Sequence, residues 1–227
     1  MKIVVAACRN RGIGYKNKLP WSIKKEMQYF KKLTIGDDTE IKYKNNNNRN
    51  NDNETNNNNN NDNYNNKNAV VMGKNTWLSL KKPLPKRDNF ILSTSLQTSD
   101  ITTSSKHSNI HLLRSLDEVR QIEKNYKKYD NIWIIGGMQL YDAFLDDPIT
   151  ETIFYTNVLD YYTCDTFFPN IPDHFENVYG TKIFKDDKTN VGFQVSIYQN
   201  KNTNISDKIK NVNKNILNLH NAIREIR

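Results

Sequence analysis

The chain is 227 residues long, carries a formal net charge of +8 and contains two cysteines. Its length suits one sizeable α/β domain or two small ones, and it has no run of the about 18 apolar residues that a membrane-spanning helix needs. Two cysteines exclude a disulfide framework, so Cys8 and Cys164 are expected to be reduced thiols in a cytoplasmic protein. The positive charge favours anionic ligands without choosing among nucleic acid, acidic lipid and phosphorylated small molecules.

Apolar, strand-like runs alternate with helical patterns from the start of the chain to about residue 200. The apolar start, residues 1–5, is too short for a signal peptide. The alternation predicts an α/β fold, with a largely parallel sheet, helices on both faces and an antiparallel hairpin at the last edge. Strands are expected at residues 3–8, 69–72, 89–93, 110–113, 131–135, 152–158, 181–184 and 192–198. Helices are expected at residues 22–33, 74–80, 115–126 and 138–145.

The helix expected at residues 22–33 places an acid on its apolar face. Ile23, Met27 and Phe30 follow helical spacing and share one side, while four lysines lie on the polar side. Glu26 is three residues from Ile23 and four from Phe30, so it points toward the apolar side. A buried carboxylate is costly unless something pairs with it. Glu26 is therefore a candidate functional group.

Residues 45–68 have a different composition, with 17 asparagines among 24 residues and Tyr64 as the one large apolar side chain. Such a segment cannot bury enough surface to offset the entropy of ordering it. We therefore expect a disordered insertion at residues 36–68 within one domain. A functional, aggregation-prone asparagine tract is the alternative.

The end of the chain, residues 201–227, carries a heptad pattern. Its apolar residues alternate at spacings of four and three for about three repeats, near the minimum for a coiled coil. They are Ile205, Ile209, Val212, Ile216, Leu219, Ile223 and Ile226. An amphipathic helix is expected, which either docks on its own domain, pairs with a second copy, or contacts another domain.

Two predicted strands each end at a glycine that is followed at once by a helix. Gly136-Gly137 follows the strand at 131–135, and Gly73 precedes Lys74, Asn75 and Thr76. Such turns bring backbone N–H groups close to a phosphate. An ordinary tight turn or a capped helix is the alternative at each place. Together the turns suggest a dinucleotide across the strand ends, although Walker and Rossmann fingerprints are absent.

Other chemistries have little support in the sequence. The four histidines have no ligand spacing with cysteines or carboxylates, so no metal is expected. No serine or cysteine stands in a recognisable nucleophile elbow. Basic residues are not interleaved with aromatics along a strand, as single-strand nucleic-acid binders require, so no nucleic-acid partner is expected.

Ordered motifs cover roughly residues 2–198, leaving out the insertion. They are Ala6-Ala7, Ile13-Gly14, Asn17, Leu19-Pro20-Trp21, Glu26, Phe30, Val71-Met72-Gly73-Lys74, Thr76-Trp77, Ser79, Pro83-Leu84-Pro85, Arg87, Asn89, Ile135-Gly136-Gly137, Tyr141, Thr156, Cys164-Asp165-Thr166 and Phe168-Pro169. In this order they resemble the dihydrofolate reductase family. Glu at position 26 is more similar to the eukaryotic and protist type, including reductase domains fused to thymidylate synthase. The resemblance implies the family's mostly parallel sheet within a reductase domain at residues 1–200.

The resemblance also implies a reaction: NADPH reduces 7,8-dihydrofolate to 5,6,7,8-tetrahydrofolate, with hydride transfer to C6 and protonation of N5. Glu26 matches the family's active-site acid, which hydrogen-bonds the pterin. Thr156 matches the hydroxyl that bonds this carboxylate, and Trp21 matches an indole beside an ordered water. Arg87 matches the arginine that binds the substrate's α-carboxylate. The apolar walls of the substrate site match Val5, Ala7, Met27, Phe30, Leu80, Leu84 and Ile135.

For the cofactor, the resemblance implies NADPH, with residues 13–19 as a mobile loop over the nicotinamide. Thr94 stands where many members carry a basic residue for the 2′-phosphate, and Lys74 and Arg114 are the cations that can compensate. The glycine pair commonly carries a cis peptide in this family. The residues implied for the cofactor are Ala6, Ala7, Ile13, Gly14, Lys18, Leu19, Lys74, Asn75, Thr76, Ser93, Thr94, Arg114, Gly136, Gly137, Met138, Gln139, Leu140 and Tyr141.

Two rival functions are set against this one. A riboflavin-pathway reductase shares the fold and NADPH, but it should lack both Glu26 and the Arg87 clamp. A non-catalytic, asparagine-rich RNA-binding protein gives no reason for an acid and a hydroxyl partner at these positions.

The insertion and the tail also resemble features of protist enzymes that fuse this reductase to thymidylate synthase. Those enzymes often lengthen the same helix-to-strand connection and continue past the reductase through a linker. The tail is therefore expected to associate with itself or with a partner such as a thymidylate synthase. No membrane partner is expected.

Overall fold

The computed structural model describes residues 1–36, 67–101, 109–125, 129–203, 205–224 and 226. Within these residues nine strands form one sheet, in the order β10-β11-β7-β1-β6-β3-β4-β5 with β9 also paired to β11. Neighbours from β7 to β5 run parallel, and β9, β10 and β11 are antiparallel. The strands of this sheet are β1 (Lys2–Cys8), β3 (Lys67–Gly73), β4 (Arg87–Leu92), β5 (Ile110–Leu113), β6 (Tyr129–Ile134), β7 (Thr152–Val158), β9 (Phe175–Gly180), β10 (Phe184–Lys185) and β11 (Gly192–Asn200).

The predicted α/β class and the antiparallel last edge are therefore confirmed. The predicted strand at 181–184 is wrong in extent, because only Phe184 and Lys185 pair with β11 there. Alternation missed three strands, β2 (Gly12–Gly14), β8 (Thr166–Phe167) and β9, of which the first two are too short to show a period of two. β2 and β8 form a separate antiparallel pair.

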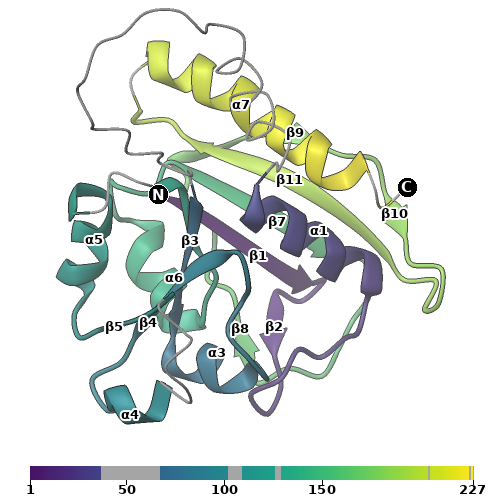
Figure 1. Ribbon diagram of the computed structural model, residues 1–227. Helices are drawn as coiled ribbons and strands as arrows, with labels where there is room; N and C mark the ends of the chain where they lie inside the picture. The colour runs from purple at the N-terminus through teal and green to yellow at the C-terminus, as the bar shows by residue number, and fades with distance from the viewer. Residues whose placement is uncertain (37–66, 102–108, 126–128, 204, 225, 227) are drawn as a thin grey trace, which may run out of the picture.

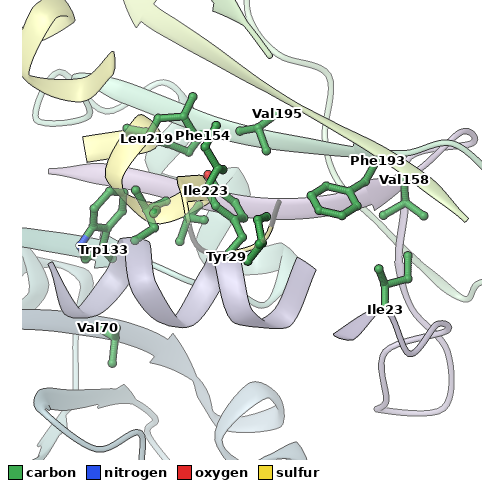
Figure 2. Close-up of a cluster of buried hydrophobic side chains, with 14 of the residues drawn as sticks. Ile23, Tyr29, Val70, Trp133, Phe154, Val158, Phe193, Val195, Leu219 and Ile223 are labelled. Carbon is green, nitrogen blue, oxygen red and sulfur yellow. The ribbon is translucent and has the colours of Figure 1, made fainter. Parts of the chain in front are cut away.

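Helices cover both faces of the sheet (Figure 1). On one face, apolar residues of α5 and α6 pack with Ile3, Val71 and Ile134. On the other face, α1 and α7 pack with Val4, Val70 and Phe154, the last two of which are labelled in Figure 2. The helices are α1 (Lys24–Ile35), α3 (Lys74–Ser79), α4 (Thr98–Ile101), α5 (Leu116–Asn125), α6 (Met138–Leu145) and α7 (Ile205–Arg224), of which the one-turn α4 was not predicted.

Successive residues of a strand point to opposite faces, so both faces of a doubly covered sheet must be apolar. Strand β3 illustrates this, since Ala69 and Val71 join one cluster while Val70 and Met72 join the other. All four side chains are fully buried. The continuous apolar run from Ala69 to Met72 thus fits the position of β3 in the interior of the sheet, between β6 and β4.

The predicted insertion at residues 36–68 falls largely on residues 37–66, which lie outside the described residues. Its predicted end is wrong, because Lys67 and Asn68 belong to β3. Asn68 is buried, and its side-chain amide donates to the carbonyl of Thr34 at 3.1 Å. This hydrogen bond thus connects the end of α1 with the start of β3.

The tail forms α7, which lies beside α1 and along β11 (Figure 1). Leu219, Ile223 and Ile226 of the heptad stripe are buried in the core, as Figure 2 shows for the first two. Lys2 Nζ donates to the side chain of Asn215 at 2.7 Å, which anchors α7 to β1. The second half of the stripe therefore docks on its own domain, the first of the three alternatives.

Candidate active site

A cavity of about 820 Å³ opens at the carboxyl ends of parallel strands β1, β3, β4 and β6. Ligands of open α/β sheets bind at this edge, where the connections to the following helices diverge. One half of the cavity is lined by α1 and by residues after α3. The other half is lined by the turns that follow β3, β4 and β6. We call them the α1 half and the turn half.

Glu26 lies in the first turn of α1 and faces the α1 half of the cavity. The residue is only 4% exposed, and no described residue donates a hydrogen bond to its carboxylate. Burial raises the pKa of Glu26 to about 7, because the charged form loses its hydration without gaining a partner. Glu26 thus changes its protonation near neutral pH, as a group that handles protons must.

The N-terminus of α1 is held in place from another part of the chain. Ile23 at the N-cap offers no side-chain oxygen, and the backbone N–H of Lys25 donates to Asp186 at 3.2 Å. Asp186 follows β10, and its other oxygen accepts from the backbone N–H of Thr189 at 3.1 Å. The hairpin between β10 and β11 therefore fixes the turn of helix that carries Glu26.

Apolar side chains surround Glu26 in the α1 half. The cavity lining includes six of the residues predicted for a substrate wall: Val5, Met27, Phe30, Leu80, Leu84 and Ile135. The predicted core-facing position of Met27 is wrong, because its side chain is 45% exposed. Tyr29, which the helical spacing missed, is fully buried instead. The buried stripe of α1 runs through Glu26, Tyr29 and Leu33, so it is rotated from the predicted one.

The turn half is built largely from backbone. The peptide between Gly136 and Gly137 is cis, and the carbonyl of Gly136 accepts from the N–H of Gly73 at 2.7 Å. A Cβ on Gly136 would lie 3.2 Å from the ring of Tyr141, and its φ of +112° disfavours any other residue. The two glycine turns therefore contact each other through their backbones, and Gly136 leaves no room for a side chain beside Tyr141.

Two helices begin at these turns without a side-chain cap. Gly73 is the N-cap of α3 and Gly137 is the N-cap of α6. The first N–H groups of a helix have no partner within the helix, and they favour an anion. Around them Lys74, Asn75 and Thr76 line the cavity, as do Met138 to Tyr141. Donors and a lysine at paired turns fit the pyrophosphate of a dinucleotide cofactor.

The turn after β4 extends this half of the cavity through Ser93, Thr94 and Ser95. Lys74 Nζ donates to Ser95 Oγ at 2.8 Å, so its charge lies beside Thr94. Arg114 does not line the cavity; its guanidinium donates to the carbonyls of Ser93 and Leu96 at 2.8 and 2.6 Å. Of the two predicted compensating cations, Lys74 therefore lies at the cavity, whereas Arg114 holds the turn.

The segment at residues 13–19 lines the mouth of the cavity through Ile13, Gly14, Asn17, Lys18 and Leu19. Its tip is a tight turn in which Tyr15 and Lys18 exchange two backbone hydrogen bonds of 2.9 and 3.0 Å. Lys16 and Asn17 between them both have positive φ, as turns of this kind require.

Three predicted residues of the α1 half do not line the cavity. Thr156 lies on β7 opposite Ala6 of β1 and is 1% exposed, and the described residues include no hydrogen bond between it and Glu26. Trp21 is buried beside Tyr162, and its Nε1 has no described partner. Ala7 is fully buried in the core, on the same face of β1 as Val5 but outside the cavity lining. The roles predicted for these residues remain predictions.

Arg87 also lies behind the cavity wall. Its side chain is 1% exposed and donates to the hydroxyl of Thr34 and to the carbonyl of Pro85. Both acceptors are neutral, and no described carboxylate pairs with Arg87. Burial lowers the pKa of Arg87 to about 10. A buried cation with neutral partners retains the capacity to bind an anion.

Sequence reasoning missed several lining residues. Gly73 and Ser95 belong to turns that it identified, and Asn17 and Thr166 belong to quoted motifs, so each carried a signal. Val4, Leu92, Leu116 and Ala143 carried none, because they are ordinary apolar residues whose place depends on tertiary packing. The missed residues are Val4, Asn17, Gly73, Ser79, Leu92, Ser95, Leu116, Ala143 and Thr166.

The described residues contain no group of three or more histidine, cysteine, aspartate or glutamate side chains that can hold a metal ion. Among the same residues, no helix is long and apolar enough to cross a membrane.

The sheet and its cavity define an α/β protein with a ligand cleft at the strand ends, in which Glu26 is the one acid among the described lining residues. The family model of dihydrofolate reductase matches residues 1–39 and 59–200. The chain is 34% identical to a dihydrofolate reductase of Drosophila melanogaster over 179 residues, which cover 78% of this chain and 82% of that protein. For a dihydrofolate reductase of Gallus gallus the identity is 32% over 175 residues, covering 74% and 77%.

A bifunctional dihydrofolate reductase-thymidylate synthase of Plasmodium chabaudi is 35% identical over 133 residues, which cover 57% of this chain and 22% of that protein. This chain belongs to the dihydrofolate reductase family. The predicted resemblance is thus confirmed, and α7 lies beyond the residues that the family model matches.

Proposed function

We propose that this protein reduces 7,8-dihydrofolate to 5,6,7,8-tetrahydrofolate with NADPH. The observation that carries the proposal is the pairing of two unlike halves in one cavity. The α1 half offers one acid, Glu26, among apolar walls, and the turn half offers backbone donors and Lys74. A flat, polar-edged pterin suits the first half, and a phosphorylated dinucleotide suits the second.

NADPH, when bound, supplies the hydride that reaches C6 of the substrate. The chain's own residues position the substrate and manage the proton. Glu26 binds the amino-pyrimidine edge of the pterin and keeps a proton available near neutral pH, because burial has raised its pKa to about 7. The Nε1 of Trp21, which has no partner among the described residues, is the donor for a water near this acid. Thr156 supports the carboxylate once substrate and water have filled the cavity.

NADPH is favoured over NADH by the turn after β4. Ser93, Thr94 and Ser95 give hydroxyls for a 2′-phosphate, and Lys74 supplies the charge through its position at Ser95. Arg114 shapes this turn through its two carbonyl contacts. The substrate's glutamate carboxylate is assigned to Arg87, whose guanidinium has only neutral partners among the described residues.

The test is consumption of NADPH, followed by its absorbance, after 7,8-dihydrofolate is added to the full chain. Turnover that requires both compounds is expected. A ribosylated aminopyrimidine serves as the rival substrate, and turnover of that compound with none of dihydrofolate would overturn the proposal in favour of a riboflavin-pathway type of reductase.

Association through α7 is proposed only for its outer side, because Leu219 and Ile223 are buried on the domain. Ile209 and Leu217 remain 61% and 57% exposed and offer the apolar contact for a second copy or a synthase partner. Light scattering of the full chain and of a variant carrying Ile209→Lys and Leu217→Lys, which leaves the buried side of α7 intact, tests this. A monomer mass for the full chain would exclude self-association.

The free thiols of Cys8 and Cys164 favour a reducing compartment such as the cytoplasm.

A further inference from the structure

Two free cysteines lie close together beside the cavity, although 156 positions separate them in the sequence. Cys8 ends β1, and Cys164 precedes β8. Their sulfurs are 3.8 Å apart. Cys8 is buried and Cys164 is half-buried, so an external reagent reaches Cys164 first. The reaction described above uses neither thiol.

The backbone of β2 holds the two sulfurs together. A Cβ added to Gly12 would lie 2.2 Å from the Sγ of Cys164 and 3.0 Å from the Sγ of Cys8. The sulfurs thus occupy the space beside Gly12 that a side chain would otherwise take. Cys8 Sγ also donates to Asn10 Oδ1 at 2.8 Å. The glycine therefore permits the close approach of the two thiols.

The thiol pair is connected to the cavity wall by backbone contacts. Asp165, which follows Cys164, donates from its N–H to the carbonyl of Gly14 at 3.0 Å, and its carboxylate accepts from the N–H of Lys16 at 2.7 Å. Gly14 and Thr166 both line the cavity. A covalent bond between the sulfurs would therefore restrain the β2–β8 pair where it borders the cavity.

We propose that Cys8 and Cys164 are an oxidisable dithiol that low-molecular-weight disulfides convert into an intramolecular disulfide. The Cys164 thiolate attacks the small disulfide and forms a mixed disulfide, releasing the first small thiolate. The Cys8 thiolate then attacks the sulfur of Cys164, and the second small thiolate leaves. One small disulfide is reduced to two thiols, which take up the two protons that the cysteines lose.

Both cysteines are free thiols in the structure, and their conversion to a disulfide is expected to be slow. Burial raises the pKa of the Cys164 thiol to about 11, and the neighbouring Cys8 adds to this effect. The thiolate is the reacting form, so exchange is slow at neutral pH and needs an excess of oxidant. A small sulfur movement is required as well, because a disulfide bond is only about 2.05 Å long. The two sulfurs are therefore close enough to form a disulfide after a small movement, but they are not bonded in this structure.

The test incubates the native full chain with excess oxidised glutathione and then quantifies thiols and disulfide-linked peptides by mass spectrometry. Loss of both thiols and a peptide linking Cys8 to Cys164 are expected, with recovery after dithiothreitol. Cys164→Ser should leave Cys8 unmodified because that residue is buried. Two intact thiols, a stable glutathione adduct on Cys164, or disulfide-linked dimers would each overturn the proposal.

The thiol readout does not depend on the proposed function. Turnover by the oxidised protein rests on that function, and it should fall about threefold or more, return after dithiothreitol, and stay unchanged in oxidant-treated Cys164→Ser. An internal disulfide without any change in turnover would overturn the link to the cavity wall. An inactive reduced protein that still forms the disulfide would contradict the proposed function alone.

Discussion

The two halves of the cavity are built by different means. The α1 half consists of side chains: one buried acid and apolar walls from a helix and the residues after α3. The turn half consists mainly of backbone: paired glycines, two uncapped helix starts and hydroxyls. Substitutions in the first half should therefore alter chemistry and protonation, whereas those in the second should alter cofactor binding through shape.

The largest effect is expected from Glu26→Gln, which keeps the shape of the side chain and removes its ionisation. We predict a loss of about 100-fold or more in kcat/KM at neutral pH, the scale of general acid–base contributions. Acidic pH should relieve part of the loss, because substrate then arrives protonated. Glu123→Gln, on the exposed side of α5, is the matched control. Activity of Glu26→Gln equal to that of the parent would remove the proposed role.

The same substitution should stabilise the ligand-free protein. The pKa of Glu26 rises from 4.5 to about 7 on folding, so the folded state binds the proton more tightly than the unfolded state. The stability from this group is full below pH 4.5 and is lost as the pH rises through 7, at a cost of about 3 kcal/mol. Urea unfolding should show Glu26→Gln gaining that amount over the parent at pH 8 relative to pH 4. An equal stability difference at both pH values would contradict the burial effect.

In the turn half, Gly136→Ala should weaken cofactor binding about tenfold without changing the pH profile of turnover. The new Cβ meets Tyr141 at 3.2 Å, and the φ of +112° adds strain of about 1–3 kcal/mol. Gly180→Ala is the control, since its Cβ would meet only ordinary contacts at 3.7 Å and beyond. Titration of cofactor fluorescence measures both. If Gly136→Ala bound the cofactor as tightly as the parent, the shape of the turn half would not determine cofactor binding.

Arg87→Lys tests how far the α1 half extends. The substitution keeps a charge but loses the two-donor fork, so KM for dihydrofolate should rise about tenfold. A dihydropterin substrate without the glutamate should show no such change. Similar losses for both substrates would mean that Arg87 acts only by holding Thr34 and Pro85 in place.

The smallest effect is expected from Lys74→Gln. Its charge lies at Ser95, so NADPH should bind severalfold more weakly while NADH, which lacks the 2′-phosphate, is unaffected. Lys81→Gln, an exposed lysine outside the cavity lining, is the control. Equal losses for the two cofactors would place the 2′-phosphate elsewhere.

The same contrast explains what sequence reasoning achieved. Glu26 was found because an acid on an apolar helical face is visible in the spacing, and β5 and α6 were predicted at their observed bounds. The buried face of α1 is rotated relative to the predicted one. The spacing of apolar residues cannot distinguish a core-facing Tyr29 from a cavity-facing Met27. Both are apolar, and only the packing of α7 and the sheet distinguishes their environments.

Tertiary contacts account for the remaining misses. The heptad pattern of the tail is the same whether the helix pairs with another chain or packs against its own domain. The buried contact between Lys2 and Asn215 that anchors it joins residues 213 positions apart. Arg114 and Lys74 were equivalent as loop cations, but one donates to carbonyls of the turn and the other lies at the cavity. The sequence shows that both residues are cations, but it does not show which of the two side chains reaches the cavity.

The most direct test of the account is the titration of Glu26 itself in the ligand-free protein. The carboxyl carbon of ¹³C-labelled glutamate, assigned by comparison with Glu26→Gln, reports this protonation by NMR. We predict a midpoint near pH 7, as burial without a partner requires. A midpoint near the ordinary value of 4.5 would contradict the claim that burial prepares Glu26 to handle a proton at neutral pH.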